Sequence, residues 1–110
     1  MFELEENLKL LNELKTKLVQ IKSSMKIESL KIELQNLEQE SLSEDFWNNQ
    51  ENSSKVFAKI KVLQKKVNSY ESLASEINDL IEMNKLLEIE PDVELLKELL
   101  KSTALAVKKS

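Results

Sequence analysis

The sequence contains no glycine, cysteine, histidine or arginine, and its only proline is Pro91. The lack of cysteine excludes disulfides and thiolate metal sites, and the lack of histidine removes the usual general base and the commonest metal ligand. The lack of glycine excludes Gly-rich phosphate loops and nucleophile elbows. The lack of arginine removes the side chain best suited to bidentate phosphate recognition. We therefore predict that this chain is not an enzyme and holds no metal or cofactor.

The remaining candidate for catalysis is a pair of carboxylates that act as general acid and base, for example Glu94 and Glu98. Such pairs arise by chance in a helical chain rich in glutamate, and the sequence shows no nucleophile or pocket beside them. We therefore expect no small-molecule substrate.

Length and charge limit the remaining possibilities. The 110 residues are enough for one small domain, so we expect a single helical domain over 1–110. The 16 lysines and 20 acidic residues give a net charge of -4, which argues against general or sequence-specific binding to nucleic acid. The sequence shows no signal peptide and no apolar run of membrane-spanning length. We expect a soluble, cytoplasmic protein.

Apolar residues recur at helical spacing along almost the whole chain. The first segment carries two parallel stripes: Leu4, Leu11, Leu18 and Met25, then Leu14 and Ile21, with Asn7 as the polar exception in the second. The next stripe is Ile27, Leu30, Leu34 and Leu37. The long third stripe alternates steps of four and three: Val56, Ile60, Leu63, Val67, Tyr70, Ala74, Ile77 and Ile81. The last face is Leu95, Leu96, Leu99, Leu100, Thr103 and Val107.

These stripes predict four helices, at about 2–23, 25–40, 49–88 and 91–108. The stripe breaks at Ser23 and Ser24, so the second segment is either a separate helix or a bent continuation of the first. Pro91 suits the first position of the last helix. We predict an all-α fold, a three- to four-helix antiparallel bundle with one long helix and coiled-coil-like packing. Because Ser110 follows no helix stop signal, we expect a fragment of a longer protein.

The connector before the long helix carries two adjacent aromatic residues, Phe46 and Trp47. We expect them to form a hydrophobic plug at one end of the bundle, because buried aromatics dominate small cores. The alternative is an exposed partner anchor, because tryptophan is enriched at binding hot spots. Asn48 and Glu51 have the spacing of a capping box, in which Asn48 caps the long helix and Glu51 reaches back.

Five lysines and no acidic residue lie between Asn52 and Tyr70. Three of them fall within about 40° of one another on a helix, and these form the lysine strip: Lys55, Lys59 and Lys66. The strip is a candidate contact for rRNA or a partner protein. The alternative is a solvated face, or one that complements glutamates of the same chain: Glu28, Glu33, Glu38 and Glu40. Exposed ion pairs contribute only about 0–1 kcal/mol, so such a pattern needs no function.

The run Leu-Ser-Glu-Asp-Phe-Trp-Asn at 42–48, followed by a long lysine-containing helix, resembles the N-terminal region of the bacterial peptide chain release factor 2 family. The residues that carry this resemblance are Asp45, Phe46, Trp47, Asn48 and Glu51. The opening Met-Phe-Glu is also similar, as is the order of a long helix, an acidic break at 88–93 and a Leu-rich helix. The resemblance covers essentially all 110 residues.

This resemblance implies the helical first domain of a cytoplasmic translation-termination protein of the class I release factors. Family members occupy the ribosomal decoding site at UGA or UAA and trigger release of the peptide. They use a Ser-Pro-Phe-type motif and a Gly-Gly-Gln motif, and this chain contains neither. The resemblance therefore implies an accessory role by contact with the ribosome near the stalk base, and with the GTPase that recycles release factors.

Two other hypotheses remain open at the level of sequence. The first is a structural coiled-coil protein that self-associates through its heptad stripes, and the second is a regulator that folds only on a partner. An accessory domain predicts a compact monomer, whereas the coiled coil predicts an elongated, concentration-dependent oligomer. A regulator that folds on binding predicts weak helicity when alone.

Overall fold

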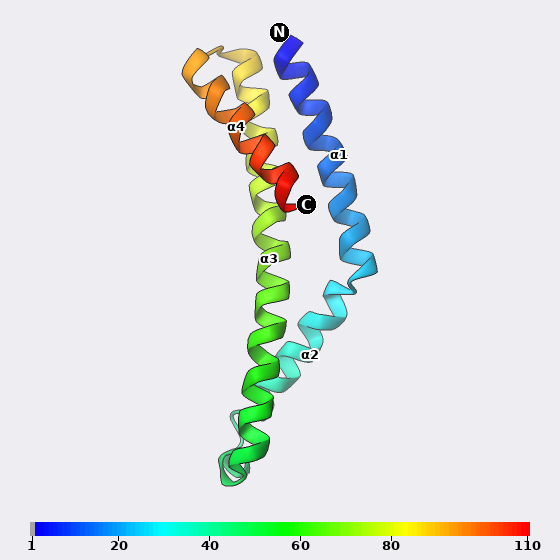
Figure 1. Ribbon diagram of the computed structural model, residues 1–110, viewed down its shortest axis with the longest axis vertical. Helices are drawn as coiled ribbons and strands as arrows, with labels where there is room; N and C mark the ends of the chain where they lie inside the picture. The colour runs from blue at the N-terminus through cyan, green and yellow to red at the C-terminus, as the bar shows by residue number, and fades with distance from the viewer. Residues whose placement is uncertain (1) are drawn as a thin grey trace. The chain divides into compact units, whose positions relative to one another are not determined.

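The computed structural model describes residues 2–110, which form four α-helices, one 3-10 helix and no strand. The elements are α1 (Phe2–Ser24), α2 (Ile27–Glu40), the 3-10 helix η1 (Glu44–Asn48), α3 (Gln50–Ile89) and α4 (Val93–Lys109). α3 is much longer than the others (Figure 1). The prediction of an all-α fold with one long helix is confirmed.

The chain divides into two compact units. The terminal unit consists of residues 2–21 and 71–110, and it contains most of α1, the second half of α3 and all of α4. The central unit is Lys22–Tyr70, and it contains α2, η1 and the first half of α3. Each unit has its own buried residues.

The core of the terminal unit is built from three helices. α4 turns back alongside the end of α3, and α1 lies beside both (Figure 1). The apolar residues buried there are Leu4, Leu11, Leu14, Leu18, Ile77, Leu80, Ile81, Leu87, Leu99 and Ala106. Full burial of such a leucine or isoleucine contributes about 1.5–3 kcal/mol, so the stripes of α1 and α3 supply most of the stabilisation.

One polar layer crosses this core. The Nδ2 of Asn7 donates to Asn84 Oδ1 at 3.0 Å and to Thr103 Oγ1 at 3.1 Å. Asn84 Nδ2 in turn donates to the Leu4 carbonyl at 3.0 Å. The layer joins α1, α3 and α4, which explains why Asn7 is the polar exception in the stripe of Leu14 and Ile21, since a buried amide is tolerated where it is hydrogen-bonded.

Two expectations for α4 are wrong. Leu95, Leu100 and Val107 are 37–46% exposed, whereas Ala106 is fully buried. The buried stripe of α4 is narrow, because its only neighbours in the unit are α1 and α3. Pro91 does not begin the helix either: Asp92 is the N-cap and its Oδ1 accepts from the Leu95 amide at 3.1 Å. An Asp cap satisfies a free amide of the first turn, so Pro91 stays outside the helix.

The core of the central unit is smaller. Its buried apolar residues are Ile27, Phe46, Ile60, Leu63 and Val67, and the predicted leucines of α2 are half-buried. The last three buried residues follow the predicted stripe of the long helix.

The question of one bent helix or two is settled by the backbone of Lys26. This residue is in the left-handed region, with φ 53° and ψ 49°, so α1 and α2 are separate helices. A left-handed residue breaks the run of i→i−4 hydrogen bonds and redirects the chain. Met25 lies in this turn and is 43% exposed, so the prediction that it continues the first stripe is wrong.

Candidate functional site

Three aromatic side chains meet where the connector joins α3, and we call them the aromatic cluster: Phe46, Trp47 and Phe57. The ring centroids of Phe46 and Trp47 are 5.3 Å apart and those of Phe46 and Phe57 are 5.8 Å apart, both edge to face. Trp47 and Phe57 lie 5.3 Å apart and tilted. These separations are in the range of favourable aromatic pairs, so the cluster holds each ring in place.

The cluster is only partly buried. Phe46 is 5% exposed, so it closes the core of the central unit as the plug hypothesis predicts. Trp47 is 60% exposed and Phe57 is 38% exposed. The expectation that Trp47 belongs to the plug is therefore wrong, because η1 directs the two neighbouring side chains differently. An indole fixed by two rings but open to solvent has the character of a binding anchor.

Phe57 was not among the predicted site residues. It follows Val56, a member of the long stripe, and falls on the flank of that stripe. A large aromatic residue beside a helical stripe is the signal that points to it.

The cap of α3 lies one residue later than predicted. Asn49 Oδ1 accepts from the Asn52 amide at 3.1 Å, and Asn48 is the last residue of η1. Glu51 makes no hydrogen bond back to the cap in the described chain, and its Oε1 lies 3.6 Å from Lys55 Nζ. Asp45 is exposed in the first turn of η1. The prediction of a capping box that begins at Asn48 is therefore wrong, because Asn48 belongs to η1.

The lysine strip lies on the exposed side of the first half of α3. Lys59 Nζ is 2.7 Å from Glu33 Oε1, an ion pair between α3 and α2. The pair of Lys55 with Glu51 is 3.6 Å long between side chains that are 76% and 83% exposed, so it contributes at most about 1 kcal/mol. Lys66 makes no ion pair with another residue of the described chain.

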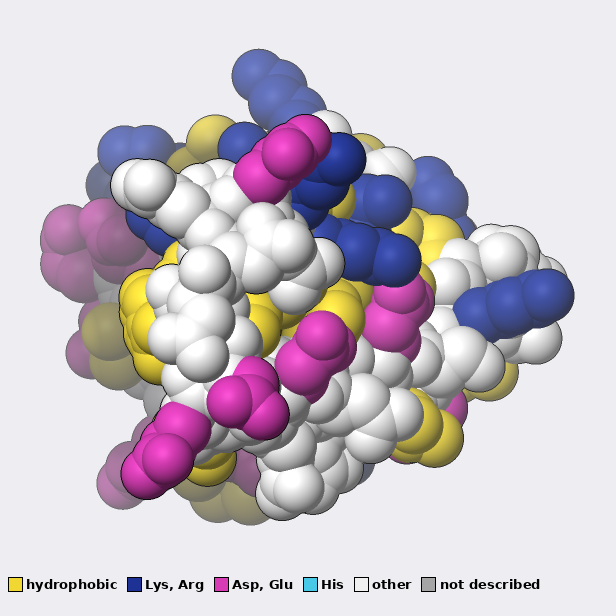
Figure 2. All heavy atoms as spheres, turned by 90° about the horizontal axis from the view of Figure 1, so that it is seen from below, with side chains coloured by type: hydrophobic (Ala, Val, Ile, Leu, Met, Phe, Trp, Pro, Cys, Tyr) yellow, Lys and Arg dark blue, Asp and Glu magenta, His cyan; other side chains and the backbone are white. Residues whose placement is uncertain are grey.

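Two members of the strip therefore face a glutamate of the same chain, Lys59 one on α2 and Lys55 one within α3, and only the first of these glutamates was considered from sequence. Lys59 matches Glu33, one of the four glutamates considered from sequence. Lys55 and Lys66 keep their charged groups in solvent. Figure 2 views the molecule from below and shows several lysine side chains close together in the upper half of the view, with carboxylates among them and in the lower half.

Charge is unevenly divided between the two units. The central unit has eight lysines and seven acidic residues, whereas the rest of the chain has eight lysines and thirteen acidic residues. The central unit is thus the part of this acidic chain that phosphate repels least at long range.

Other kinds of site are not found in the described part of the chain. Residues 2–110 contain no cluster of three metal-ligating side chains. None of the helices they form is long and apolar enough to span a bilayer.

Comparison with known proteins gives the family. Residues 30–110 match the model of the PCRF domain. The chain is 33% identical over 96 residues to "Peptide chain release factor 2" of Staphylococcus saprophyticus, which covers 87% of this chain and 25% of that protein. It is 33% identical over 89 residues to "Peptide chain release factor 2" of Nautilia profundicola, covering 81% and 24% respectively. The chain spans about a quarter of the length of these curated relatives. The resemblance carried by Asp45 to Asn48 is confirmed, and the chain belongs to the family of proteins with a PCRF domain.

Proposed function

We propose that residues 1–110 act as one N-terminal accessory domain of a release-factor-2-like translation-termination protein of the cytoplasm. The observation that carries this proposal is the PCRF match over residues 30–110, together with two relatives named peptide chain release factor 2. Both relatives align with the chain over only about a quarter of their own length. A part of that size contributes binding and position, while codon recognition and peptide release belong to other regions.

The composition supports a role without chemistry. A chain without glycine has no Gly-Gly-Gln motif, and a Ser-Pro-Phe-type motif is excluded because Pro91 lies between Glu90 and Asp92. The cysteine thiol and the histidine imidazole, the commonest nucleophile of thiol chemistry and the usual general base, are also missing. We infer that the domain works by surface contact.

The contact surface that we propose is on the central unit. Phosphates of rRNA near the stalk base are contacted by the lysine strip, Lys55, Lys59 and Lys66. Trp47 binds a protein surface next to that rRNA. Each phosphate contact contributes about one unit to the slope of log affinity against log salt. The GTPase that recycles release factors is the second proposed partner, on the grounds of family resemblance alone.

Cosedimentation with ribosomes over a range of salt concentrations tests this proposal. The test variant replaces the lysine strip with glutamine, in the triple substitution K55Q/K59Q/K66Q. A matched variant removes three exposed lysines of the terminal unit, in K85Q/K97Q/K101Q. We expect the strip variant to bind more weakly with a shallower salt slope, while the matched variant binds as the parent does. Equal losses in both variants, or no binding by the parent, would refute the proposed surface.

We further propose that the chain is a monomer. The heptad leucines of α1 that a self-associating coiled coil would need at its interface are buried inside the terminal unit, at 0–5% exposure for Leu4, Leu11 and Leu18. Sedimentation equilibrium tests this directly. A single 12.7 kDa species supports the accessory domain, and a concentration-dependent oligomer supports the coiled-coil alternative.

A further inference from the structure

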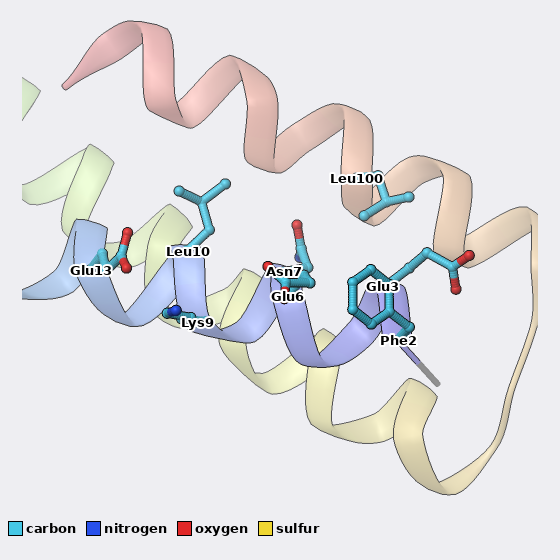
Figure 3. Close-up of a pocket in the computed structure, with 8 residues that line it drawn as sticks. All are labelled: Phe2, Glu3, Glu6, Asn7, Lys9, Leu10, Glu13 and Leu100. Carbon is cyan, nitrogen blue, oxygen red and sulfur yellow. The ribbon is translucent and has the colours of Figure 1, made fainter.

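A groove runs between α1 and α4 on the terminal unit. It has a volume of about 470 Å³ and is open to solvent. Figure 3 shows Leu10 pointing from α1 toward α4 and Leu100 pointing from α4 toward α1. These two side chains are 38% and 37% exposed, and Phe2 at the end of the groove is 72% exposed. Two adjacent helices thus leave an apolar strip without a helix packed on it within the unit.

The polar layer beneath the groove presents one unused hydrogen-bond acceptor. The Thr103 hydroxyl donates to the Leu99 carbonyl at 2.8 Å, so its oxygen accepts from Asn7. Asn84 uses its Nδ2 on the Leu4 carbonyl, so its Oδ1 also needs a donor from Asn7.

Because both Asn84 Oδ1 and Thr103 Oγ1 accept from Asn7, the orientation of the Asn7 amide is fixed. Its nitrogen faces the core, and its Oδ1 has no donor among the described residues. Asn7 is only 6% exposed and it lines the groove. None of the described side chains has a fully buried polar atom without a partner, so this Oδ1 is reachable from the groove. An acceptor in an apolar groove selects a partner that has a donor at the matching position.

The charge around the groove is mostly negative. Three exposed glutamates of α1 line it, at Glu3, Glu6 and Glu13, against one lysine, Lys9. The surrounding terminal unit is the acidic one, with thirteen acidic residues and eight lysines. Complementary charge on an occupant favours both encounter and correct pairing.

We propose that this groove binds a basic amphipathic helix of a partner protein. Apolar side chains spaced i, i+3, i+4 and i+7 cover Leu10 and Leu100, as in other helix-in-groove complexes. Lysine or arginine flanking that stripe pairs with the α1 glutamates, and one polar donor within the stripe meets Asn7 Oδ1. The occupant completes a four-helix arrangement with α1, α3 and α4. The inference does not depend on the proposed ribosome contact, which lies on the central unit.

The test uses the 110-residue chain and two synthetic peptides followed by fluorescence anisotropy. Both peptides are about 18 residues long, five helical turns, with a leucine stripe and one central glutamine. One has lysines on both flanks of the stripe, and the other has glutamates at the same positions. We expect the lysine peptide to bind at least tenfold more tightly than the glutamate peptide.

Two variants and a matched control locate the binding. Leu10→Lys and Leu100→Lys each place a cation in the groove, and both positions are exposed enough for the chain to fold. Leu86→Lys makes the same change on α3 at a leucine that is 65% exposed and does not line the groove. We expect the first two to weaken binding of the lysine peptide at least tenfold and the control to leave it within twofold.

Several results would overturn the inference. Equal affinity for the two peptides would show that charge does not select the occupant. If Leu86→Lys weakened binding of the lysine peptide as much as Leu10→Lys and Leu100→Lys do, the peptide would not bind in the groove. If the lysine peptide did not bind the parent chain, a basic amphipathic helix would not be the occupant of the groove. A parent chain that dimerises, with Leu10→Lys restoring the monomer, assigns the groove to a second copy instead. Thermal melts of each variant by circular dichroism verify that loss of binding is not loss of fold.

Discussion

Replacing Asn84 with leucine is expected to destabilise the chain by about 1–3 kcal/mol. Asn84 is completely buried, and it accepts from Asn7 and donates to the Leu4 carbonyl, both at 3.0 Å. Leucine has the same branched shape but offers neither a donor nor an acceptor. The cost therefore comes from the buried amide of Asn7, which keeps only its bond to Thr103, and an unsatisfied buried polar group costs about 1–3 kcal/mol.

The double variant N7L/N84L separates this mechanism from simple damage to the core. It removes both amides, and Thr103 keeps its own bond to Leu99. Replacement of both partners by apolar groups of similar shape is nearly neutral, so we expect stability within about 1 kcal/mol of the parent.

Urea unfolding followed by far-ultraviolet circular dichroism measures both variants. A free energy of unfolding that falls by about 1–3 kcal/mol in N84L and recovers in N7L/N84L supports the hydrogen bonds described for the polar layer. A single variant N84L as stable as the parent, or a double variant that is at least as destabilised as N84L, would refute the reasoning.

Three further perturbations test other parts of the fold by the same unfolding assay. Ile60→Asp puts a charge in the central core and should cost several kcal/mol, whereas Val62→Asp, at a position 53% exposed, should change stability little; equal melts would contradict the stripe of α3. Asn49→Ala should cost about 1 kcal/mol through loss of the α3 cap, and Asn48→Ala clearly less; the reverse order would restore the capping box predicted from sequence. Phe46→Ala should cost about 3–5 kcal/mol, and a cost under 1 kcal/mol would mean that it does not close the core.

The helical class and the main stripes could be predicted from sequence because they rest on repetition. Leucines seven apart in α1 and the four-three alternation of α3 each involve many residues, so one local deviation leaves the pattern intact. The terminal-unit core residues Leu11 and Ile77 are completely buried, as the stripes predict. The family resemblance rested on a short run around Trp47, and the comparisons confirm it.

Features decided by a single residue could not be predicted in this way. The left-handed conformation of Lys26, which separates α1 from α2, leaves no periodic signal in the sequence. The cap is Asn49 and not Asn48 because Asn48 is the last residue of η1, and two adjacent asparagines are equally good caps. Local chemistry allowed both choices, and the end of η1 at Asn48 leaves Asn49 as the cap.

Parts of the candidate site were harder still. Periodicity gave no means of telling which of two adjacent aromatics turns inward, and the exposure of Trp47 depends on the 3-10 geometry of η1. Lys59 pairs with Glu33 across two helices whose register the sequence did not fix. The roles of Lys55, Lys59 and Lys66 as a contact surface stay predictions.

The measurement that tests the central claim most directly is the sequence of the gene beyond the codon for Ser110. The account predicts an open reading frame that continues into a Ser-Pro-Phe-type motif and then a Gly-Gly-Gln motif, which would make this chain the first domain of a termination factor. A stop codon immediately after Ser110 would contradict it, because the chain would then be a freestanding helical protein without the means to release a peptide.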